Sequence, residues 1–127
     1  MTRGRRLIFT FTSGPVRILI IDDNESEAHD ASLALHAGLP APADVVCVGT
    51  LGQAIRALLE AAFDLMVVEP QVLSHHHTAT IAGLHSTAPS VPMVVHGRAL
   101  TDDAALEALR SGALECVTKD ANRSGNL

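Results

Sequence analysis

The sequence predicts one α/β domain built on a parallel, doubly wound sheet, because two patterns alternate along the chain. Short runs of Val, Ile, Leu and Met recur five times, as expected for strands that are covered on both faces. Between them, apolar residues recur at helical spacing behind polar capping residues. Strand and helix alternation of this kind implies parallel strands joined by helical crossovers. The expected strands are Val16–Ile21, Val45–Val48, Leu65–Val68, Val91–Val95 and Leu114–Thr118.

Four helices are expected between these strands, and most have a start signal, a stop signal or both. A residue with a short polar side chain precedes three of them, where it can accept a hydrogen bond from the first turn. Glycine follows two of them, where it can end the helix. The signals are Asn24 with Glu27 and Gly38 for the first helix, Thr50 with Gln53 for the second, Thr78 and Ser86 as rough limits of the third, and Thr101 with Gly112 for the fourth.

The composition bounds the class of protein. The chain has 127 residues, which suits one domain, and 47% of them are hydrophobic, which favours a packed core. A formal net charge of -5 argues against a nucleic-acid-binding surface. Three arginines near the start precede the apolar run Leu7–Phe11, which is too short for a signal peptide core or a membrane span. We therefore expect a cytoplasmic protein that contacts neither membrane nor nucleic acid.

Charged residues follow three of the expected strands. Asp22 and Asp23 come after the first strand, Glu69 after the third and Lys119 after the fifth. In a doubly wound sheet the functional site lies at the carboxyl ends of the strands, so these groups are expected to converge there. Crowded carboxylates repel, so a divalent cation or the lysine must compensate them. The alternative is an acid pair that only begins a helix and a lysine that only ends a strand.

Four segments follow one another in the sequence: Arg17–Asp23, Phe63–Glu69, Val91–Val95 and Ala108–Ala113, the last followed by Lys119. In this order and at these separations they resemble the response-regulator receiver family of two-component phosphorelay signalling. The resemblance covers about residues 16–120 and implies a flavodoxin-like fold with strand order 2-1-3-4-5. It also implies an acid pocket that binds Mg²⁺ and an aspartate after the third strand that takes a phosphoryl group from a histidine kinase. In the family, a Ser or Thr after the fourth strand and an aromatic residue on the fifth then report the phosphate.

Some family positions are kept in this chain. Asp22 and Asp23 match the acid pair, and Lys119 matches the lysine that contacts the phosphoryl group. Gln71 stands where a main-chain carbonyl usually binds the metal. The resemblance thus assigns a metal site to Asp23, Glu69 and Gln71.

Other family positions are changed. Glu69 replaces the phosphoacceptor aspartate, Gly97 replaces the switch hydroxyl and Cys116 replaces the switch aromatic. Glu69 is one methylene longer, which should impair in-line attack geometry. Gly97 has no hydroxyl to bond a phosphoryl oxygen, and Cys116 has no ring to rotate. Leu73 and His77 also replace a usual proline and glycine.

Two functions follow from this pattern. The first is a pseudo-receiver, which is not an enzyme and requires no cofactor beyond weak Mg²⁺ binding. It acts by binding proteins, either a histidine kinase or an output domain of the same polypeptide, and it can also self-associate. The alternative is a working Mg²⁺-dependent receiver that phosphorylates an acid of the pocket. A small-ligand module is a remote third option, because no glycine-rich phosphate loop is present.

The division of the chain is expected to be an arm at 1–15, the receiver-like domain at 16–120 and a truncated segment at 121–127, too short for a fifth helix. The arm segment Leu7–Phe11 has strand character, and we expect it to cover the sheet face left bare or to drive self-association. Cys47 and Cys116 fall on opposite edge strands in the order 2-1-3-4-5 and cannot form a disulfide bond with each other.

The histidines of two parts of the chain have alternative interpretations. His75, His76 and His77 are consecutive, so they cannot all point one way, and an exposed loop is favoured over a zinc site. His96, beside the pocket, is either a pH-sensitive partner of an acid or a half-exposed residue at a strand end.

Overall fold

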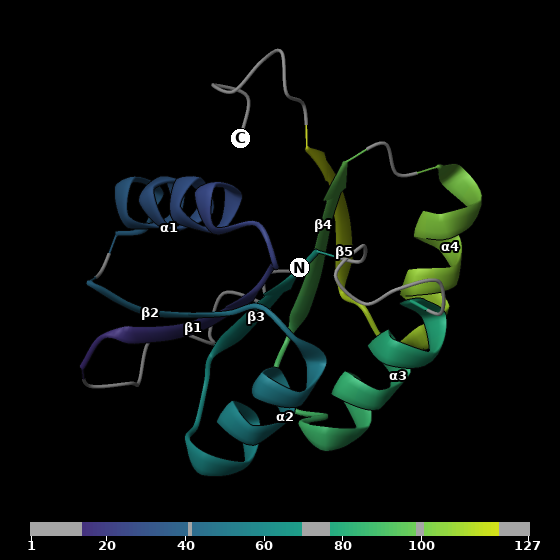
Figure 1. The fold of residues 1–127 in the computed structure, drawn as a ribbon, viewed down its shortest axis with the longest axis horizontal. Coiled ribbons are helices and arrows are strands. Elements are labelled where there is room, and N and C mark those ends of the chain that lie inside the picture. Colours follow the sequence, from purple (N-terminus) through teal and green to yellow (C-terminus); the bar gives the residue numbers. More distant parts are fainter. Residues whose placement is uncertain (1–13, 41, 70–76, 99–100, 120–127) are drawn as a thin grey trace, which may run out of the picture.

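The computed structural model describes residues 14–40, 42–69, 77–98 and 101–119, with side chains at all of these positions except 77–79, 98 and 118–119. A central sheet carries α1 on one face and α2, α3 and α4 on the other (Figure 1). The elements are β1 (Val16–Ile21), α1 (Glu25–Gly38), β2 (Ala43–Val48), α2 (Leu51–Glu60), β3 (Leu65–Val68), α3 (His77–Thr87), β4 (Met93–Arg98), α4 (Asp102–Ser111) and β5 (Glu115–Lys119).

The sheet has the strand order β2-β1-β3-β4-β5, and all four strand pairs are parallel. This confirms the predicted fold class and strand order. The chain moves from β1 to β2 in one direction and then returns to place β3 on the other side of β1. The switch point therefore lies between β1 and β3, where the carboxyl ends of parallel strands form a site in folds of this kind.

Strand limits agree with the sequence prediction at β1 and β3 and differ at β2, β4 and β5. β2 begins at Ala43, two residues before the predicted start at Val45. β4 begins at Met93, two residues after the predicted start, and continues to Arg98. Pro92 has no N–H to give to a strand pair, but its carbonyl accepts a hydrogen bond from the Met66 N–H at 2.9 Å. β5 begins one residue late, at Glu115, although the Leu114 N–H already donates to the Met93 carbonyl at 2.7 Å.

The helix starts are fixed by the three capping residues that the sequence predicted. The side chain of Asn24 accepts from the Glu27 N–H at 2.9 Å, and Thr50 accepts from the Gln53 N–H at 3.1 Å. Thr101 accepts from the Ala104 N–H, also at 3.1 Å. Each bond satisfies one N–H group that has no partner inside its helix.

Two hydrophobic clusters lie on opposite faces of the sheet, because side chains of a strand alternate between faces. In β1, Leu19 and Ile21 point to the larger cluster, and Ile18 and Ile20 point to the smaller one. The larger cluster is closed by α2, α3 and α4, and the smaller one is closed by α1. The members of the larger cluster that are almost completely inaccessible to solvent include Leu19, Ile21, Met66, Val68, Ile81, Leu84, Met93 and Val95.

The two cysteines lie where the sequence placed them. Cys47 is on β2 and Cys116 is on β5, which are the two edge strands, and both thiols are free. Residues 1–13 of the expected arm (1–15) and the whole expected truncated segment (121–127) lie outside the described residues. Within the described ranges, no helix is long and apolar enough to cross a membrane.

Candidate functional site

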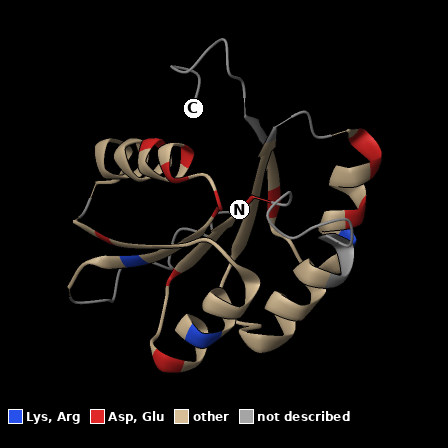
Figure 2. Cartoon of the chain, in the orientation of Figure 1, with Lys and Arg blue, Asp and Glu red and all other residues tan. Residues whose placement is uncertain are grey.

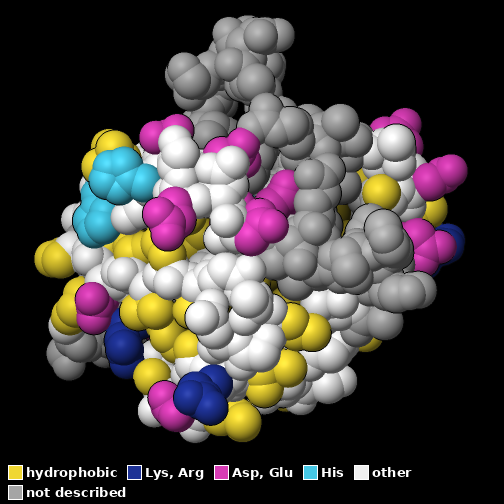
Figure 3. Space-filling view, viewed as in Figure 1, with side chains coloured by type: hydrophobic (Ala, Val, Ile, Leu, Met, Phe, Trp, Pro, Cys, Tyr) yellow, Lys and Arg dark blue, Asp and Glu magenta, His cyan; other side chains and the backbone are white. Residues whose placement is uncertain are grey.

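The candidate site lies at the carboxyl edge of the sheet, beside the start of α1. Figure 2 shows acidic residues at the start of α1 and in the loop before it, and Figure 3 shows acidic side chains gathered on the same part of the surface. Asp22 directly follows β1 and Glu69 directly follows β3. Because these strands are neighbours and Ile21 is paired with Val68, the two acids occupy adjacent positions at the end of the strand pair.

Glu69 is held closely against β1. Its N–H donates to the carbonyl of Ile21 at 2.9 Å, which continues the β1–β3 pairing by one residue. Its side chain is buried, with 6% of its surface exposed, and Asp22 beside it is 7% exposed. Two carboxyl groups are thus withdrawn from water on adjacent strands, an arrangement that favours a compensating positive charge nearby.

Asp22 and Asp23 are adjacent in the sequence but differ in their contacts and exposure. The Asp22 N–H donates to the carbonyl of Val48 at 2.9 Å, and its carboxylate accepts from the Asn24 N–H at 3.0 Å. Asp22 therefore also shapes the turn into α1, as the alternative interpretation of the acid pair expected. Asp23 is exposed and lies at the surface of the site.

The remaining polar groups assigned to the site are placed only in part. Lys119 ends β5 opposite Arg98, so its backbone lies at the same edge of the sheet, but its side chain is outside the described residues. Gln71 is also outside them. Among the residues that are described, no group of three or more His, Cys, Asp and Glu side chains is arranged to hold a metal ion.

Gly97 lies within β4, paired with Thr118 of β5, and is buried. It brings no side chain to the carboxyl edge, where a hydroxyl would be needed to contact a phosphoryl oxygen. His96, one residue earlier, is 9% exposed and lines a groove on the α1 face. This burial contradicts the half-exposed alternative for His96.

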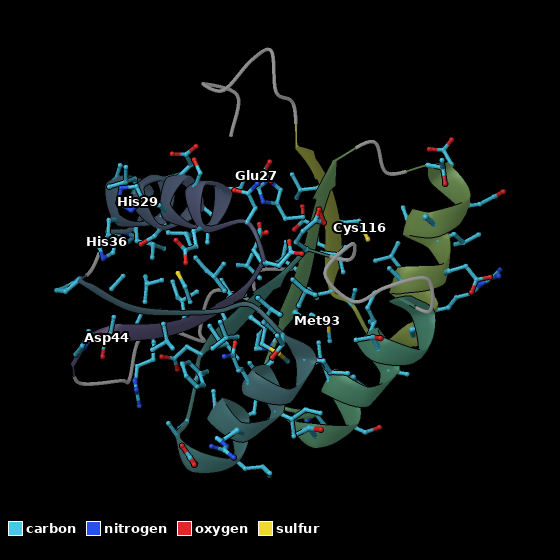
Figure 4. All side chains as sticks on the ribbon, in the orientation of Figure 1. Glu27, His29, His36, Asp44, Met93 and Cys116 are labelled. Carbon is cyan, nitrogen blue, oxygen red and sulfur yellow. The ribbon has the colours of Figure 1, made fainter. Side chains whose placement is uncertain are left out.

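Cys116 lies on the α4 side of β5 (Figure 4). It pairs with Val95 and its Sγ donates to the carbonyl of Ala105 in α4 at 3.6 Å. Burial raises the pKa of the Cys116 thiol, and the neighbouring negative charge of Glu115 raises it further. The thiol therefore stays protonated at neutral pH and acts as a small packing group between β5 and α4.

A polar groove of about 580 Å³ adjoins the acid pair between the starts of α1 and α2, and the sequence reasoning did not find it. Its lining includes Asp22, Asp23, His29 and Cys47. Burial raises the pKa of Cys47, and the charge of Asp22 raises that pKa further. One feature of the sequence could have indicated this groove: Cys47 is the penultimate residue of β2, the strand that pairs with β1 and so ends near Asp22.

The run of histidines is mostly outside the description. His75 and His76 lie beyond the described residues, and His77 is the first residue of α3, one residue before the expected start at Thr78. The position of its imidazole is not described.

The sequence matches no protein-family model and no curated protein. Solved structures match closely in fold. The phosphorylated cyanobacterial phytochrome response regulator RcpA has a TM-score of 0.76 at 21% identity, over 88% of this chain and 86% of that one. A response regulator from Burkholderia pseudomallei, with a phosphorylated aspartic acid and a calcium ion, has a TM-score of 0.71 at 22% identity, over 87% of this chain and 63% of that one. A response regulator from Thermotoga maritima has a TM-score of 0.74 at 15% identity, over 84% and 86% of the two chains.

These identities are low, so the likeness concerns the fold, and it covers 84–88% of this chain in the three structures named. The sheet of this chain is parallel and has the order β2-β1-β3-β4-β5. Its acids lie at the switch point, where sheets of this doubly wound type form their sites. The chain has the fold of the response-regulator receiver domains.

Proposed function

We propose that this chain is a receiver-like signalling module of a phosphorelay system that is not phosphorylated on Glu69 and that acts by binding other proteins. Fold alone does not assign a function, so the proposal depends on the residues at the carboxyl edge of the sheet. The observation that carries it is the position of Glu69, buried directly after β3 beside Asp22.

The geometry of Glu69 supports the loss of phosphoryl transfer. Its main chain is fixed to β1 by the bond to Ile21, so the extra methylene displaces its carboxylate by about 1.5 Å relative to an aspartate. Displacements of this size are enough to spoil in-line attack, which needs close alignment of the reacting atoms. A buried glutamate at this position also places an acidic side chain permanently where receivers acquire negative charge only when they are phosphorylated.

The two switch positions support the same proposal. Gly97 offers no hydroxyl. Cys116 has no aromatic ring that could change position, and its thiol donates a hydrogen bond to the Ala105 carbonyl. With neither group able to report a phosphate, partner binding is constitutive or controlled in another way. We therefore assign no enzymatic activity to the chain and no required cofactor, with Mg²⁺ bound weakly.

Exposed leucines provide a surface for protein partners. Leu106 and Leu109 lie three residues apart on α4 and are 45% and 44% exposed, and Leu114, in the turn before β5, is 66% exposed. Residues three apart share a face of a helix, and apolar groups exposed together are typical of interaction surfaces. The partners proposed are a histidine kinase, an output domain of the same polypeptide or a second copy of the chain.

A working receiver is the second candidate, and it is favoured by the acids that remain. Asp22, Asp23 and the Lys119 position are kept at the carboxyl edge. Incubation with acetyl phosphate and Mg²⁺, followed by intact mass measurement, separates the two candidates. We expect no added phosphoryl group on the chain. A gain of one phosphoryl group that maps to Glu69 would instead establish the working receiver.

A further inference from the structure

The two faces of the sheet are unequally covered by the described helices. Three helices close one face, and α1 alone closes the other, where it packs over β1 and β2 (Figure 1). The side chains of β4 and β5 that point to the α1 face therefore lie beside the cluster that α1 covers, which includes Leu65 and Val67 of β3 at its margin.

A groove of about 440 Å³ occupies this position. The second half of α1 forms one wall with Leu35 and Leu39, and the strands form the floor with Leu65, Val67, Val94 and Val117. The three valines and both wall leucines are only partly buried by the described residues. A groove with this apolar lining is of a size that takes up apolar side chains or a small ligand.

We propose that the segment Leu7–Phe11 of the same chain lies in this groove as an extended strand-like segment. The chain contains three phenylalanines, and two of them, Phe9 and Phe11, belong to this segment. Residues 7, 9 and 11 are all large and apolar, so an extended segment presents Leu7, Phe9 and Phe11 on one face. That face matches an apolar groove that runs beside the strands.

The connection is long enough. Val94 lies about two strand spacings (~10 Å) across and four residues (~13 Å) along the sheet from Val16, which makes about 16 Å in all. The seven residues from Phe9 to Val16 span up to about 23 Å when extended. Gly14 has a φ of +100°, a conformation that suits glycine and redirects the chain just before β1. The segment can therefore turn back at the amino edge of the sheet and enter the groove beside Leu39 and Leu65.

Charge favours the same direction. Continuing from Phe11 back to Leu7 leads toward the carboxyl edge of the sheet, and the next residues are the arginines Arg6, Arg5 and Arg3. That edge holds Asp22 and Glu69, and Figure 4 shows Glu27 at the end of α1 nearest β4. A segment seated in the groove thus brings basic residues toward an acidic edge, where opposite charges attract.

The other terminal segment matches the groove less well. Residues 120–127 contain only Ala121 and Leu127 as apolar residues among the eight, so they bring little apolar surface. A second copy of the chain is the competing occupant, and it predicts a contact between molecules instead of within one.

Photo-crosslinking of the full chain tests the proposal. The photoreactive analogue p-benzoylphenylalanine is placed at Phe9, at Phe11 or, as the matched control, at Thr10, which faces away from the groove in the proposed arrangement. Equal amounts of ¹⁵N-labelled and unlabelled chain are mixed before irradiation, and the crosslinked peptides are identified by mass spectrometry. We expect crosslinks from positions 9 and 11 to peptides of α1, β4 or β5 within one isotopic species, and far fewer from position 10.

Crosslinks that join labelled to unlabelled chains would assign the groove to a second copy and overturn the proposal. Absence of crosslinks into the groove from positions 9 and 11 would overturn it as well. An independent measurement is removal of residues 1–13, which should lower the melting temperature by roughly 5 °C or more. An unchanged melting temperature and an unchanged oligomeric state in the shortened chain would contradict the proposal.

Discussion

The thiol of Cys116 on β5 donates to the main-chain carbonyl of Ala105 on α4, with 3.6 Å between sulfur and oxygen. Eleven positions separate the two residues in the sequence, and the contact joins the edge strand to the helix that packs next to it. The small thiol thus fills a half-buried space at the position that the receiver resemblance assigns to a switch aromatic. A ring on that side of β5 would have to displace this contact between Cys116 and α4.

Replacing this thiol by a large ring should destabilise the fold. We expect Cys116→Tyr to lower the free energy of unfolding by about 1–3 kcal/mol, because overpacking forces neighbouring side chains and backbone to shift. Urea denaturation measures the effect. Cys47→Tyr is the matched control, because Cys47 is exposed on the opposite edge strand and surface changes usually stay within about 0.5 kcal/mol. Equal losses in the two variants would show that the packing of Cys116 against α4 is not the cause.

The two thiols should respond to different carboxylates when they are alkylated. The charge of Asp22 raises the pKa of Cys47, so Asp22→Asn should lower that pKa, increase the thiolate fraction and speed the reaction of Cys47 with iodoacetamide. The charge of Glu115 raises the pKa of Cys116, so Glu115→Gln should instead speed the reaction of Cys116 with iodoacetamide. Burial is the larger cause at both thiols, so we expect an increase of less than about tenfold in each case.

Alkylation rates at a fixed pH of about 8, followed by peptide mass analysis, separate the two sites. Each substitution serves as the control for the other, because each should leave the second thiol unchanged. A variant in which both thiols are alkylated faster would indicate a general opening of the fold and not a local charge effect.

Two glycines in the α3–α4 region should respond with opposite sign to alanine. Gly112 ends α4 with a φ of +127°, and an added Cβ would lie 2.6 Å from Cγ of His85, so Gly112→Ala combines backbone strain with a steric clash. We expect it to lose about 1–3 kcal/mol. Gly83 lies inside α3, where an added Cβ meets nothing within 4 Å, so Gly83→Ala should gain about 0.5–1 kcal/mol. Thermal unfolding of both variants checks this, and a stabilised Gly112→Ala would contradict the described end of α4.

Local signals in the sequence were sufficient for most of the fold. The caps Asn24, Thr50 and Thr101 depend on hydrogen bonds within three residues, so their chemistry can be read along the chain. Continuous apolar runs located β1 and β3 because parallel strands are buried on both faces. β4 was shifted because Val91 continues the apolar pattern although Pro92 prevents the strand from starting there.

The parts of the site that the sequence did not reveal depend on contacts between distant elements. The proximity of Cys47 to Asp22 follows from the pairing of β1 with β2, whose register places Cys47 opposite Ile20. The bond from Cys116 to Ala105 depends on how α4 lies against β5. No periodicity along the chain encodes such distances. The hydrogen bond from the Glu69 N–H to the Ile21 carbonyl likewise depends on the pairing of β1 with β3.

Magnesium binding should be weak in this chain and should improve when the glutamate is shortened. Mg²⁺ demands near-ideal octahedral oxygen geometry, and the described acids do not form a three-ligand group. In Glu69→Asp the carboxylate retracts by about one C–C bond (~1.5 Å) toward the position that the receiver resemblance assigns to it. Calorimetric titration with MgCl₂ should give weak or undetectable binding to the unaltered chain and tighter binding to Glu69→Asp. Glu115→Gln is the control, and tight binding by the unaltered chain would contradict the prediction.

Restoring two side chains should restore phosphorylation. Glu69→Asp returns the shorter nucleophile to the end of β3, and Gly97→Thr places a hydroxyl at the end of β4, where it can donate to a phosphoryl oxygen as charge develops. We expect the double variant to gain one phosphoryl group slowly from acetyl phosphate and Mg²⁺, as measured by intact mass, while the unaltered chain gains none. Glu69→Gln with Gly97→Thr is the matched control, since an amide cannot accept the group. If the folded Glu69→Asp, Gly97→Thr variant neither binds Mg²⁺ nor gains phosphate, the acids at this edge are not a disabled receiver site, and the likeness to receivers extends to the fold alone.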